Sequence, residues 1–207
     1  MRKPSAVIAR IPGARSLGRL RIGLLGGSFN PAHDGHRHIS ELALARLRLD
    51  QVWWLVSPQN PLKPVRGMAS FSQRLQRAAK STNDPRIRVS GLEASLRTRY
   101  TIDTLRALRR RYPRVRFVWL MGADNLGQFP RWRAWEAIVR TVPIAVFARP
   151  PYSKQVQSGK VAHRFLYARI RQERAGVLAD RQPPAWAFMH TLENAASATR
   201  LRKSPSG

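Results

Sequence analysis

Short apolar runs recur along the chain at intervals that leave room for one helix between them. The run at 51–56 reads QVWWLV and the run at 116–121 reads RFVWLM, so both are nearly continuous in apolar character. Such runs are typical of parallel strands that are covered on both faces. Strands are predicted on this basis at 20–25, 51–56, 87–89, 116–121 and 144–147.

Between these runs, apolar residues recur at helical spacing. Helices are predicted at 36–47, 71–81, 101–112 and 132–140, and proline-containing turns at 83–85, 112–113 and 142–143. Helical character returns around 160–174, and 185–189 reads as a last strand. This alternation predicts an α/β fold, a doubly wound parallel sheet with helices on both faces, in a single domain with ligands at the carboxyl ends of the strands.

The segment 26–36, GGSFNPAHDGH, lies between the first predicted strand and the first predicted helix. Gly26 and Gly27 have no Cβ, so their backbone can take positive φ and approach a bulky anion closely. The helix opening near Gly35 or His36 offers unpaired N–H groups and a positive dipole end. His33 and His36 are three residues apart, so both rings can donate to phosphate oxygens.

Two other interpretations of this segment stay open. Two close histidines can bind a metal, although no cluster of Cys, Asp or Glu at zinc-ligand spacing accompanies them, and we assign no metal ligand. The segment can also be an ordinary turn from strand to helix with incidental histidines. The combination of paired glycines, a proline and two spaced histidines favours the phosphate interpretation.

Composition narrows the class of protein. The chain has 207 residues, which suits one domain, and no cysteine, which excludes disulfides and a thiol nucleophile and fits the cytoplasm. No apolar stretch approaches the ~18 residues of a membrane span, so no membrane association is expected. We interpret residues 1–19 as a basic flexible extension and 20–207 as the domain.

The net charge is +27, from 38 Lys and Arg against 11 Asp and Glu. Such a field attracts polyanions, so a basic nucleic-acid-binding module is one alternative. The arginines are scattered, however, and most are predicted to form solvated helix faces, for example Arg46, Arg74, Arg77 and Arg106. We therefore expect nucleic acid to bind only non-specifically.

The segment GGSFNPAHDGH resembles the G-G-x-F-D-P-x-H-x-G-H signature of the bacterial nicotinate mononucleotide adenylyltransferases, in the nucleotidyltransferase superfamily with an H-x-G-H box. Asn30 stands where the family has Asp. The resemblance implies a Rossmann-like nucleotidyltransferase domain with His33 and His36 as catalytic residues. It also implies that ATP phosphates bind at Gly26, Gly27, Ser28, Phe29 and Gly35.

Two further segments carry the resemblance on the next part of the chain. Asn60-Pro61-Leu62-Lys63 lies where the family has Pro-Pro-His-Lys or Pro-Pro-His-Arg, so only Lys63 carries over, as a catalytic contact to the triphosphate. An exposed lysine in a turn is the alternative. Segment 98–105 is similar to the family's S-Y-T-x-x-T-L, with Arg99 in place of Ser, and implies that the backbone around Thr101 receives the nicotinate carboxylate. Thr101 can also cap the helix that follows.

Segment 121–135 resembles the family's G-x-D-x-L followed by F-x-x-W. The resemblance implies that Gly122 and Asp124 bind ATP. A carboxylate at the end of a strand, where we place Asp124, can accept hydrogen bonds from ribose hydroxyls. Trp132 would offer a flat face to the pyridine ring and the Arg133 backbone a donor to its carboxylate. A core position is the alternative for Trp132 and the expectation for Trp135.

The last segment, 197–202, matches the family's I-S-x-T-x-x-R except that Ala196 replaces Ile. The resemblance implies that Ser197 and Thr199 bind phosphate and that Arg202 is catalytic, since a serine N-cap and an arginine one turn later both suit phosphate. A basic C-terminal helix with no role in a site is the alternative.

Together these segments imply adenylyl transfer from ATP to nicotinate mononucleotide, giving deamido-NAD and pyrophosphate, with Mg²⁺ bridging the phosphates. The substrate phosphate is the nucleophile, so no covalent residue is needed. A sister enzyme that adenylylates phosphopantetheine or makes a cytidylyl product is the nearest alternative. The oligomeric state stays open, with a homo-oligomer as one option.

Overall fold

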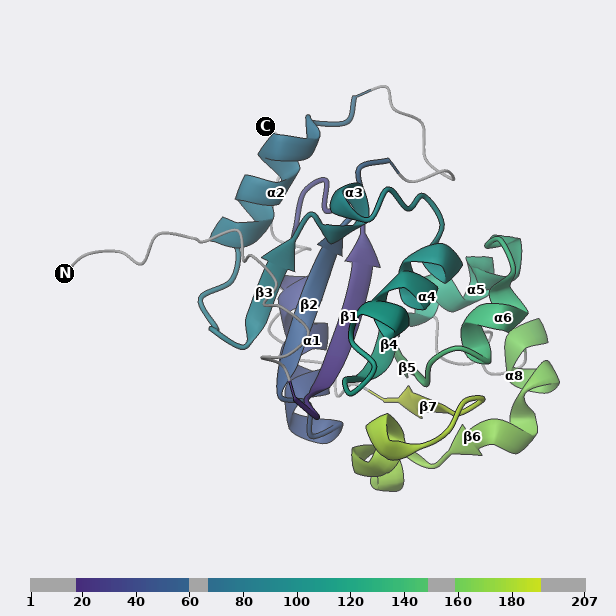
Figure 1. The fold of residues 1–207 in the computed structure, drawn as a ribbon. Helices are drawn as coiled ribbons and strands as arrows, with labels where there is room; N and C mark the ends of the chain where they lie inside the picture. The colour runs from purple at the N-terminus through teal and green to yellow at the C-terminus, as the bar shows by residue number, and fades with distance from the viewer. Residues whose placement is uncertain (1–17, 60–66, 149–158, 191–207) are drawn as a thin grey trace, which may run out of the picture.

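A seven-stranded sheet organises the computed structural model, which describes residues 18–59, 67–148 and 159–190. Its strands run in the order β3-β2-β1-β4-β5-β7-β6, and every neighbouring pair is parallel (Figure 1). The strands are β1 (Arg21–Gly27), β2 (Gln51–Val56), β3 (Ile87–Ser90), β4 (Arg116–Gly122), β5 (Ile144–Phe147), β6 (Arg169–Ile170) and β7 (Trp186–Met189). The predicted strands are therefore confirmed, and β6 is one that the sequence did not predict.

Helices cover both faces of the sheet, as predicted. One face carries α1 (Asp34–Arg46), α2 (Phe71–Lys80) and the 3-10 helix η4 (Gln172–Asp180). The other carries α3 (Leu92–Ser95), α4 (Thr101–Arg111), α5 (Ala123–Gln128), η2 (Phe129–Arg131), α6 (Trp135–Val139), α8 (Lys160–Arg164) and η3 (Leu166–Ala168). The fold is thus a doubly wound α/β sheet with two hydrophobic layers.

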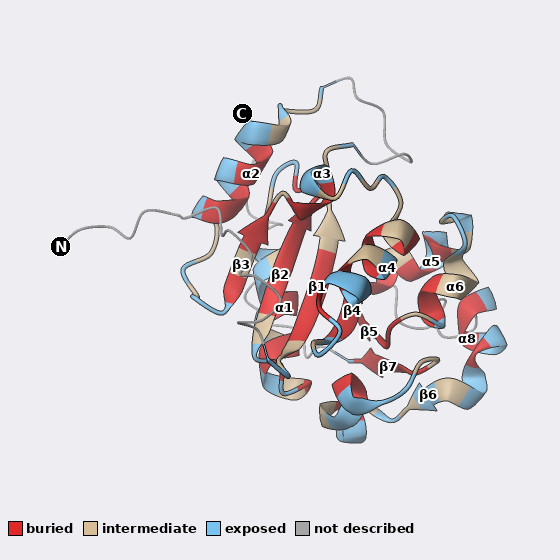
Figure 2. Ribbon diagram, viewed as in Figure 1, coloured by how far each residue is buried: buried red, intermediate tan, exposed pale blue. Residues whose placement is uncertain are grey.

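Alternating side chains of the strands build these two layers. Trp53 and Leu55 of β2 pack into one layer, while Trp54 and Val56 pack into the other, and all four are fully buried. Successive residues of a strand point to opposite faces, so a strand with apolar residues throughout suits a sheet covered on both sides. Figure 2 shows the central strands as the most deeply buried part of the fold.

The order of the strands places a crevice at one end of β1. From β1 the chain moves outward to β2 and β3, then crosses back to β4 on the opposite side of β1. The connections that leave the carboxyl ends of β1 and β4 therefore diverge, and ligands of doubly wound sheets bind at such a switch point.

The helical character predicted around 160–174 is confirmed in part, because the range holds three short helical segments and not one continuous helix. Helix α8 ends at Arg164, and the chain then forms η3, β6 and the start of η4. Phe165 is buried, and its carbonyl accepts a hydrogen bond of 2.7 Å from Nε1 of Trp186. This contact fixes the chain at Phe165, where the helix stops.

The predicted helix at 132–140 starts three residues too early. Trp132 has extended backbone and Ala134 has a φ of 51°, so α6 begins only at Trp135. The proposed extension at 1–19 lies almost entirely outside the described residues. Within the described ranges, no helix is long and apolar enough to cross a bilayer.

Candidate active site

A cavity of about 540 Å³ lies at the carboxyl end of the sheet, at the switch point. Its walls come from the end of β1, the start of α1, the residue after β2, and the segments that precede α4 and follow β4. The lining residues are Gly26, Gly27, Ser28, Phe29, Asn30, Pro31, His33, His36, Ser57, Glu93, Arg99, Tyr100, Thr101, Trp119, Asp124, Asn125, Arg131, Trp132 and Arg133.

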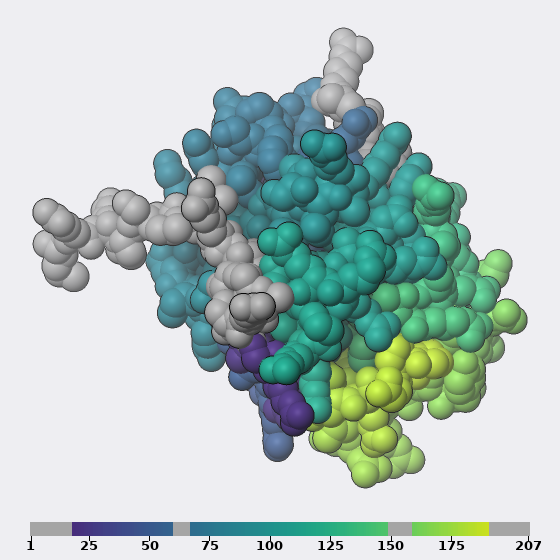
Figure 3. All heavy atoms as spheres, in the orientation of Figure 1, coloured from purple at the N-terminus to yellow at the C-terminus, as the bar shows by residue number. Residues whose placement is uncertain are grey.

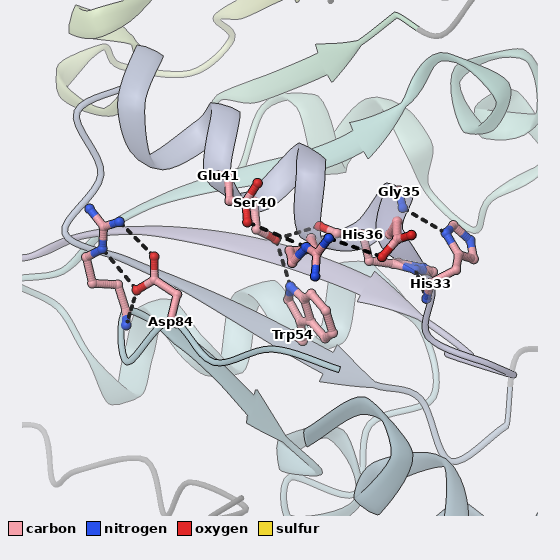
Figure 4. A network of polar contacts seen from close by, with 10 residues as sticks. His33, Gly35, His36, Ser40, Glu41, Trp54 and Asp84 are labelled. Carbon is pink, nitrogen blue, oxygen red and sulfur yellow. Dashed lines mark hydrogen bonds and ion pairs between the residues drawn. The ribbon is translucent and has the colours of Figure 1, made fainter. Parts of the chain in front are cut away.

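The two histidines form the start of α1. His33 is the N-cap, and its Nδ1 accepts a hydrogen bond of 3.1 Å from the backbone N–H of Gly35. The N–H of His33 donates to Nδ1 of His36 at 3.3 Å, which completes a capping box (Figure 4). Since Nδ1 is the acceptor in both rings, the proton of each neutral ring lies on Nε2. The arrangement therefore equips both rings to donate from Nε2.

Contacts with buried side chains fix the position of His36. Its carbonyl accepts from the hydroxyl of Ser40 at 2.8 Å, and that hydroxyl accepts from Nε1 of Trp54 at 2.8 Å. The ring of Phe29 contacts those of His36 and Trp54, with centroid distances of 4.6 and 5.2 Å, and the rings of His36 and Trp54 are themselves 5.9 Å apart. The start of α1 is thus fixed to the core of the sheet. Among the described residues, no group of three or more His, Asp or Glu could hold a metal ion.

The expected role of the paired glycines needs a correction. Gly26 and Gly27 are the last residues of β1, and of the described glycines only Gly18 and Gly67 have positive φ. A Cβ on Gly26 would lie 2.4 Å from a ring carbon of Trp119, so Gly26 is needed for space and not for its backbone angle. The positive φ of this segment, 47°, belongs to Phe29.

Thr101 lies at the cavity but does not cap α4. It is the first residue of the helix, and Tyr100 occupies the N-cap position with extended backbone. The carbonyl of Tyr100 already accepts from the N–H groups of Asp103 and Thr104. As the first helical residue, Thr101 contributes one of the N–H groups that a helix start leaves without an intrahelical partner. Its backbone position therefore suits an anion.

Trp132 combines both of the roles considered for it. It is half-buried, makes edge contacts with Phe129 and Trp119 at centroid distances of 5.3 and 6.2 Å, and also lines the cavity. Trp135 instead contacts Phe129 and packs against the core, as expected. The guanidinium of Arg133 lies 4.6 Å from the ring centroid of Tyr100. An aromatic wall with an attached cation therefore lines the same cavity as the start of α1.

Asp124 does not end a strand. Strand β4 stops at Gly122, and Asp124 is the second residue of α5, exposed and at the cavity. A Cβ on Gly122 would lie 2.3 Å from the carboxylate of Asp124, so Gly122 leaves room for that side chain.

Sequence reasoning missed two buried charged residues: Glu93, which lines the cavity, and Arg74, which bonds to the carbonyls of Ser28 and Ser57 in its wall. Arg74, predicted to lie on a solvated helix face, is 1% exposed, and burial lowers the pKa of its guanidinium. Glu93 is 8% exposed; burial raises the pKa of its carboxyl to about 7, although hydrogen bonds from Ser57 and Thr104 oppose the increase. Arg74 falls on the apolar stripe of its helix with Phe71 and Leu75, and that register was the available signal.

The structure brings together most of the predicted site residues. Gly35, in the first turn of α1, and Gly122 adjoin the cavity, and ten others line it: Gly26, Gly27, Ser28, Phe29, His33, His36, Thr101, Asp124, Trp132 and Arg133. Lys63, Ser197, Thr199 and Arg202 lie outside the described residues and stay predictions. The cavity also has cations that were not predicted for it, Arg99 and Arg131.

Comparisons with known proteins agree with one another. A family model described as cytidylyltransferase-like matches residues 24–204. A protein of Parvibaculum lavamentivorans with the name "Probable nicotinate-nucleotide adenylyltransferase" is 53% identical over 89% of this chain and 92% of that protein. A protein of the same name from Brucella suis is 48% identical over 89% of this chain and 95% of that protein.

Solved structures share the fold. Plasmodium falciparum nicotinic acid mononucleotide adenylyltransferase, complexed with NaAD, superposes with a TM-score of 0.64. The match covers 89% of this chain and 83% of that one at 15% sequence identity, which supports the architecture alone.

Proposed function

The chain belongs to the cytidylyltransferase-like family and, within it, to the nicotinate-nucleotide adenylyltransferases, and we propose how its cavity carries out their reaction. The enzyme transfers an adenylyl group from ATP to nicotinate mononucleotide in NAD biosynthesis. A phosphate oxygen of the mononucleotide attacks the α-phosphorus of ATP, the bond from that phosphorus to the bridging oxygen of the β-phosphate breaks, and pyrophosphate leaves. The product is deamido-NAD.

The proposal rests chiefly on one observation, the capping box at the start of α1. His33 and His36 accept hydrogen bonds at Nδ1 within the helix start, so the N–H of each neutral ring is on Nε2. We propose that these N–H groups donate to phosphate oxygens beside the positive end of α1. Negative charge grows on the phosphoryl oxygens in the transition state, so donors already fixed in place stabilise it. We assign the same role to Lys63 and Arg202.

The aromatic wall is proposed to bind the mononucleotide. Trp132 offers a flat face to the pyridine ring, while the N–H groups near Thr101 and Arg133 suit its carboxylate. Asp124 and the residues from Gly26 to Phe29 line the cavity. Asp124 is proposed to accept hydrogen bonds from a ribose of the adenylyl group, and Gly26 to Phe29 are proposed to bind the phosphates. The two substrates would then meet between the start of α1 and α4.

The donor set of the cavity fits phosphate and a magnesium ion that phosphate carries. Imidazole and guanidinium groups line the cavity, and these bind phosphate oxygens rather than Mg²⁺. The carboxyl groups of Glu93 and Asp124 also line it, but among the described residues they belong to no group of three that could hold a metal ion. Mg²⁺ keeps waters and substrate oxygens as ligands, and it would neutralise charge on the leaving pyrophosphate. We therefore propose Mg²⁺ as a cofactor that enters with ATP, and we assign it no protein ligand.

One assay tests this proposal against its rivals. Pyrophosphate release from ATP and Mg²⁺ would be measured with nicotinate mononucleotide, nicotinamide mononucleotide, phosphopantetheine or RNA added. Release with nicotinate mononucleotide is expected, and omission of Mg²⁺ should abolish it. Release with phosphopantetheine alone would establish the sister activity.

We also propose that the enzyme works in the cytoplasm, which its lack of cysteine fits.

A further inference from the structure

Arg74 ties together three segments at the carboxyl end of the sheet. Its Nη1 donates to the carbonyls of Ser28 at 2.6 Å and Ser57 at 2.7 Å, and its Nη2 donates to the carbonyl of Pro58 at 2.8 Å. Its Nε donates to the carbonyl of Ala69, just before α2, at 3.1 Å. One side chain of α2 thus joins the segment after β1 to the segment after β2.

These bonds all end on backbone carbonyls. A guanidinium stays charged in proteins even where burial lowers its pKa. Burying such a charge costs more free energy than burying an apolar side chain of similar size. A protein with an apolar residue at this position would usually be as stable or more stable. Core packing alone therefore does not account for an arginine at this position.

Glu93 reaches the same strand end from the opposite side. Its carboxyl group forms hydrogen bonds with the hydroxyls of Ser57 and Thr104, the latter at 3.4 Å. The hydroxyls of Thr104 and Thr98 lie 2.8 Å apart, so the contacts continue along the start of α4. Glu93 thereby connects the end of β2 to the part of the cavity that carries Thr101.

Ser57 is where the two sets of bonds meet. Its N–H donates to the carbonyl of Gly27 at 2.9 Å, its carbonyl accepts from Arg74, and its hydroxyl bonds with Glu93. Among the described residues, Arg74 and Glu93 are the two charged side chains that are buried, and both contact Ser57. Both lie at the end of the sheet that carries the cavity.

We propose that Arg74 and Glu93 are positioning residues for adenylyl transfer, which fix the segment after β1, the end of β2 and the start of α4 at the separation that the two reacting phosphates require. The inference rests on the proposed function, because the phosphates are placed by it. In-line attack depends on distance, and a displacement of about 1 Å can cost a hundredfold in rate. Loosening this junction therefore lowers kcat more than it weakens the binding of either substrate.

The first test replaces Arg74 with Lys. A lysine keeps the charge, but its single ammonium does not reproduce the planar fork that reaches carbonyls on three segments. In the full-length R74K enzyme, kcat per folded molecule should fall at least about tenfold while KM for each substrate changes less than about threefold. Arg77→Lys, on the exposed face of the same helix, is the matched control and should stay within about twofold of wild type in both parameters.

Two further measurements separate positioning from a merely structural role. Circular dichroism and thermal melts would give the folded fraction used to normalise kcat. In Arg74→Ala, guanidinium ion added far below denaturing concentrations should restore part of kcat, and ammonium ion should not. An R74K enzyme with wild-type kcat would overturn the assignment of Arg74, whereas a wild-type enzyme that releases no pyrophosphate would instead contradict the proposed function.

Glu93→Gln provides a second test of the proposal, and this test does not depend on whether the variants of Arg74 fold. The amide keeps the size of the side chain and an acceptor oxygen, but it does not titrate. Other groups that line the same cavity and can titrate or carry charge are His33, His36, Arg99, Tyr100, Asp124, Arg131 and Arg133. The pH profile of kcat should lose a step near the pKa of Glu93 in the variant, with KM little changed; superimposable profiles would exclude Glu93 from positioning.

Discussion

The two ends of the sheet use the same charged group in opposite ways. At the amino end, Arg21 and Arg116 form ion pairs with Asp180 of η4, and all three side chains are about one-third exposed or more. Figure 3 shows the start of β1 next to the C-terminal part of the described chain at this end. At the carboxyl end, Arg74 is buried and bonds to carbonyls of the site. An exposed pair contributes little, whereas a buried cation constrains the backbone around it.

Size alone does not distinguish the two ends. The amino end carries a groove of about 680 Å³, larger than the 540 Å³ of the candidate active site. Its walls include the exposed arginines Arg106, Arg109 and Arg110 of α4. The active-site cavity instead combines a helix start, an aromatic wall and the buried carboxyl group of Glu93. The difference teaches that the chemistry of the lining, more than volume, identifies the site.

The largest expected effect is the pH dependence of stability that Glu93 produces. Its pKa is about 7 in the folded protein against an ordinary value of 4.5, so folded Glu93 holds a proton that the unfolded chain has lost between these values. The bound proton stabilises the folded protein at acid pH. This contribution to the free energy of unfolding, about 3 kcal/mol, is lost as the pH rises through 7. Urea unfolding of wild type and E93Q across this range should differ by that amount, and parallel curves would refute the burial of a titrating carboxyl.

His36→Ala tests the carboxyl end through chemistry. We expect kcat to fall about a hundredfold, because a donor to the growing charge on phosphate is lost. The midpoint of thermal unfolding should change little, since the helix keeps its His33 cap. A variant with wild-type kcat would remove His36 from catalysis.

Trp132→Ala should act mainly on binding. Loss of the flat face is expected to raise KM for nicotinate mononucleotide about tenfold, with KM for ATP little changed. Trp135→Phe, at a core position beside it, is the control. A collapse of the thermal transition in place of a KM effect would show that packing dominates at Trp132.

Asp180→Asn should have the smallest effect on stability and none on kcat, because the amino end of the sheet takes no part in the reaction. Burial raises the pKa of Asp180, but hydrogen bonds from Arg116 and Arg21 outweigh it and hold the pKa below its usual value. The stabilisation is present at neutral pH and is lost as pH falls through the folded pKa. For so exposed a carboxylate, Asn should cost less than about 1 kcal/mol and leave kcat unchanged. A large loss of activity would break the contrast between the two ends.

Much of the fold followed from the sequence because its strands are nearly continuous apolar runs. The run at 51–56 and the helix at 71–81 were placed almost to the residue, and the segment from Gly26 to His36 located the cavity. The prediction that Thr101 can cap α4 was wrong. Local propensity favours a threonine at the N-cap, but the path of the chain places Tyr100 there.

Other features depend on contacts between distant parts of the chain. Strand β6 has two residues and exists through its pairing with β7, so no local pattern announces it. The contacts of Glu93 form only where the fold brings the end of β2 and the start of α4 together, and the carbonyls that Arg74 binds come from segments that are distant in the sequence. A charged residue in a sequence is expected to be exposed to solvent. The contacts of the folded chain determine which charged residues are buried.

The close approach of Gly26 and Trp119 couples two positions that are far apart in the sequence. Any side chain at 26 would enter the space of the indole ring, so the two sites cannot change independently. In a genetic selection that starts from an inactive Gly26→Ala enzyme, second-site revertants should concentrate at position 119 and carry a shorter residue there. Over evolution, the pair would be expected to vary together or not at all.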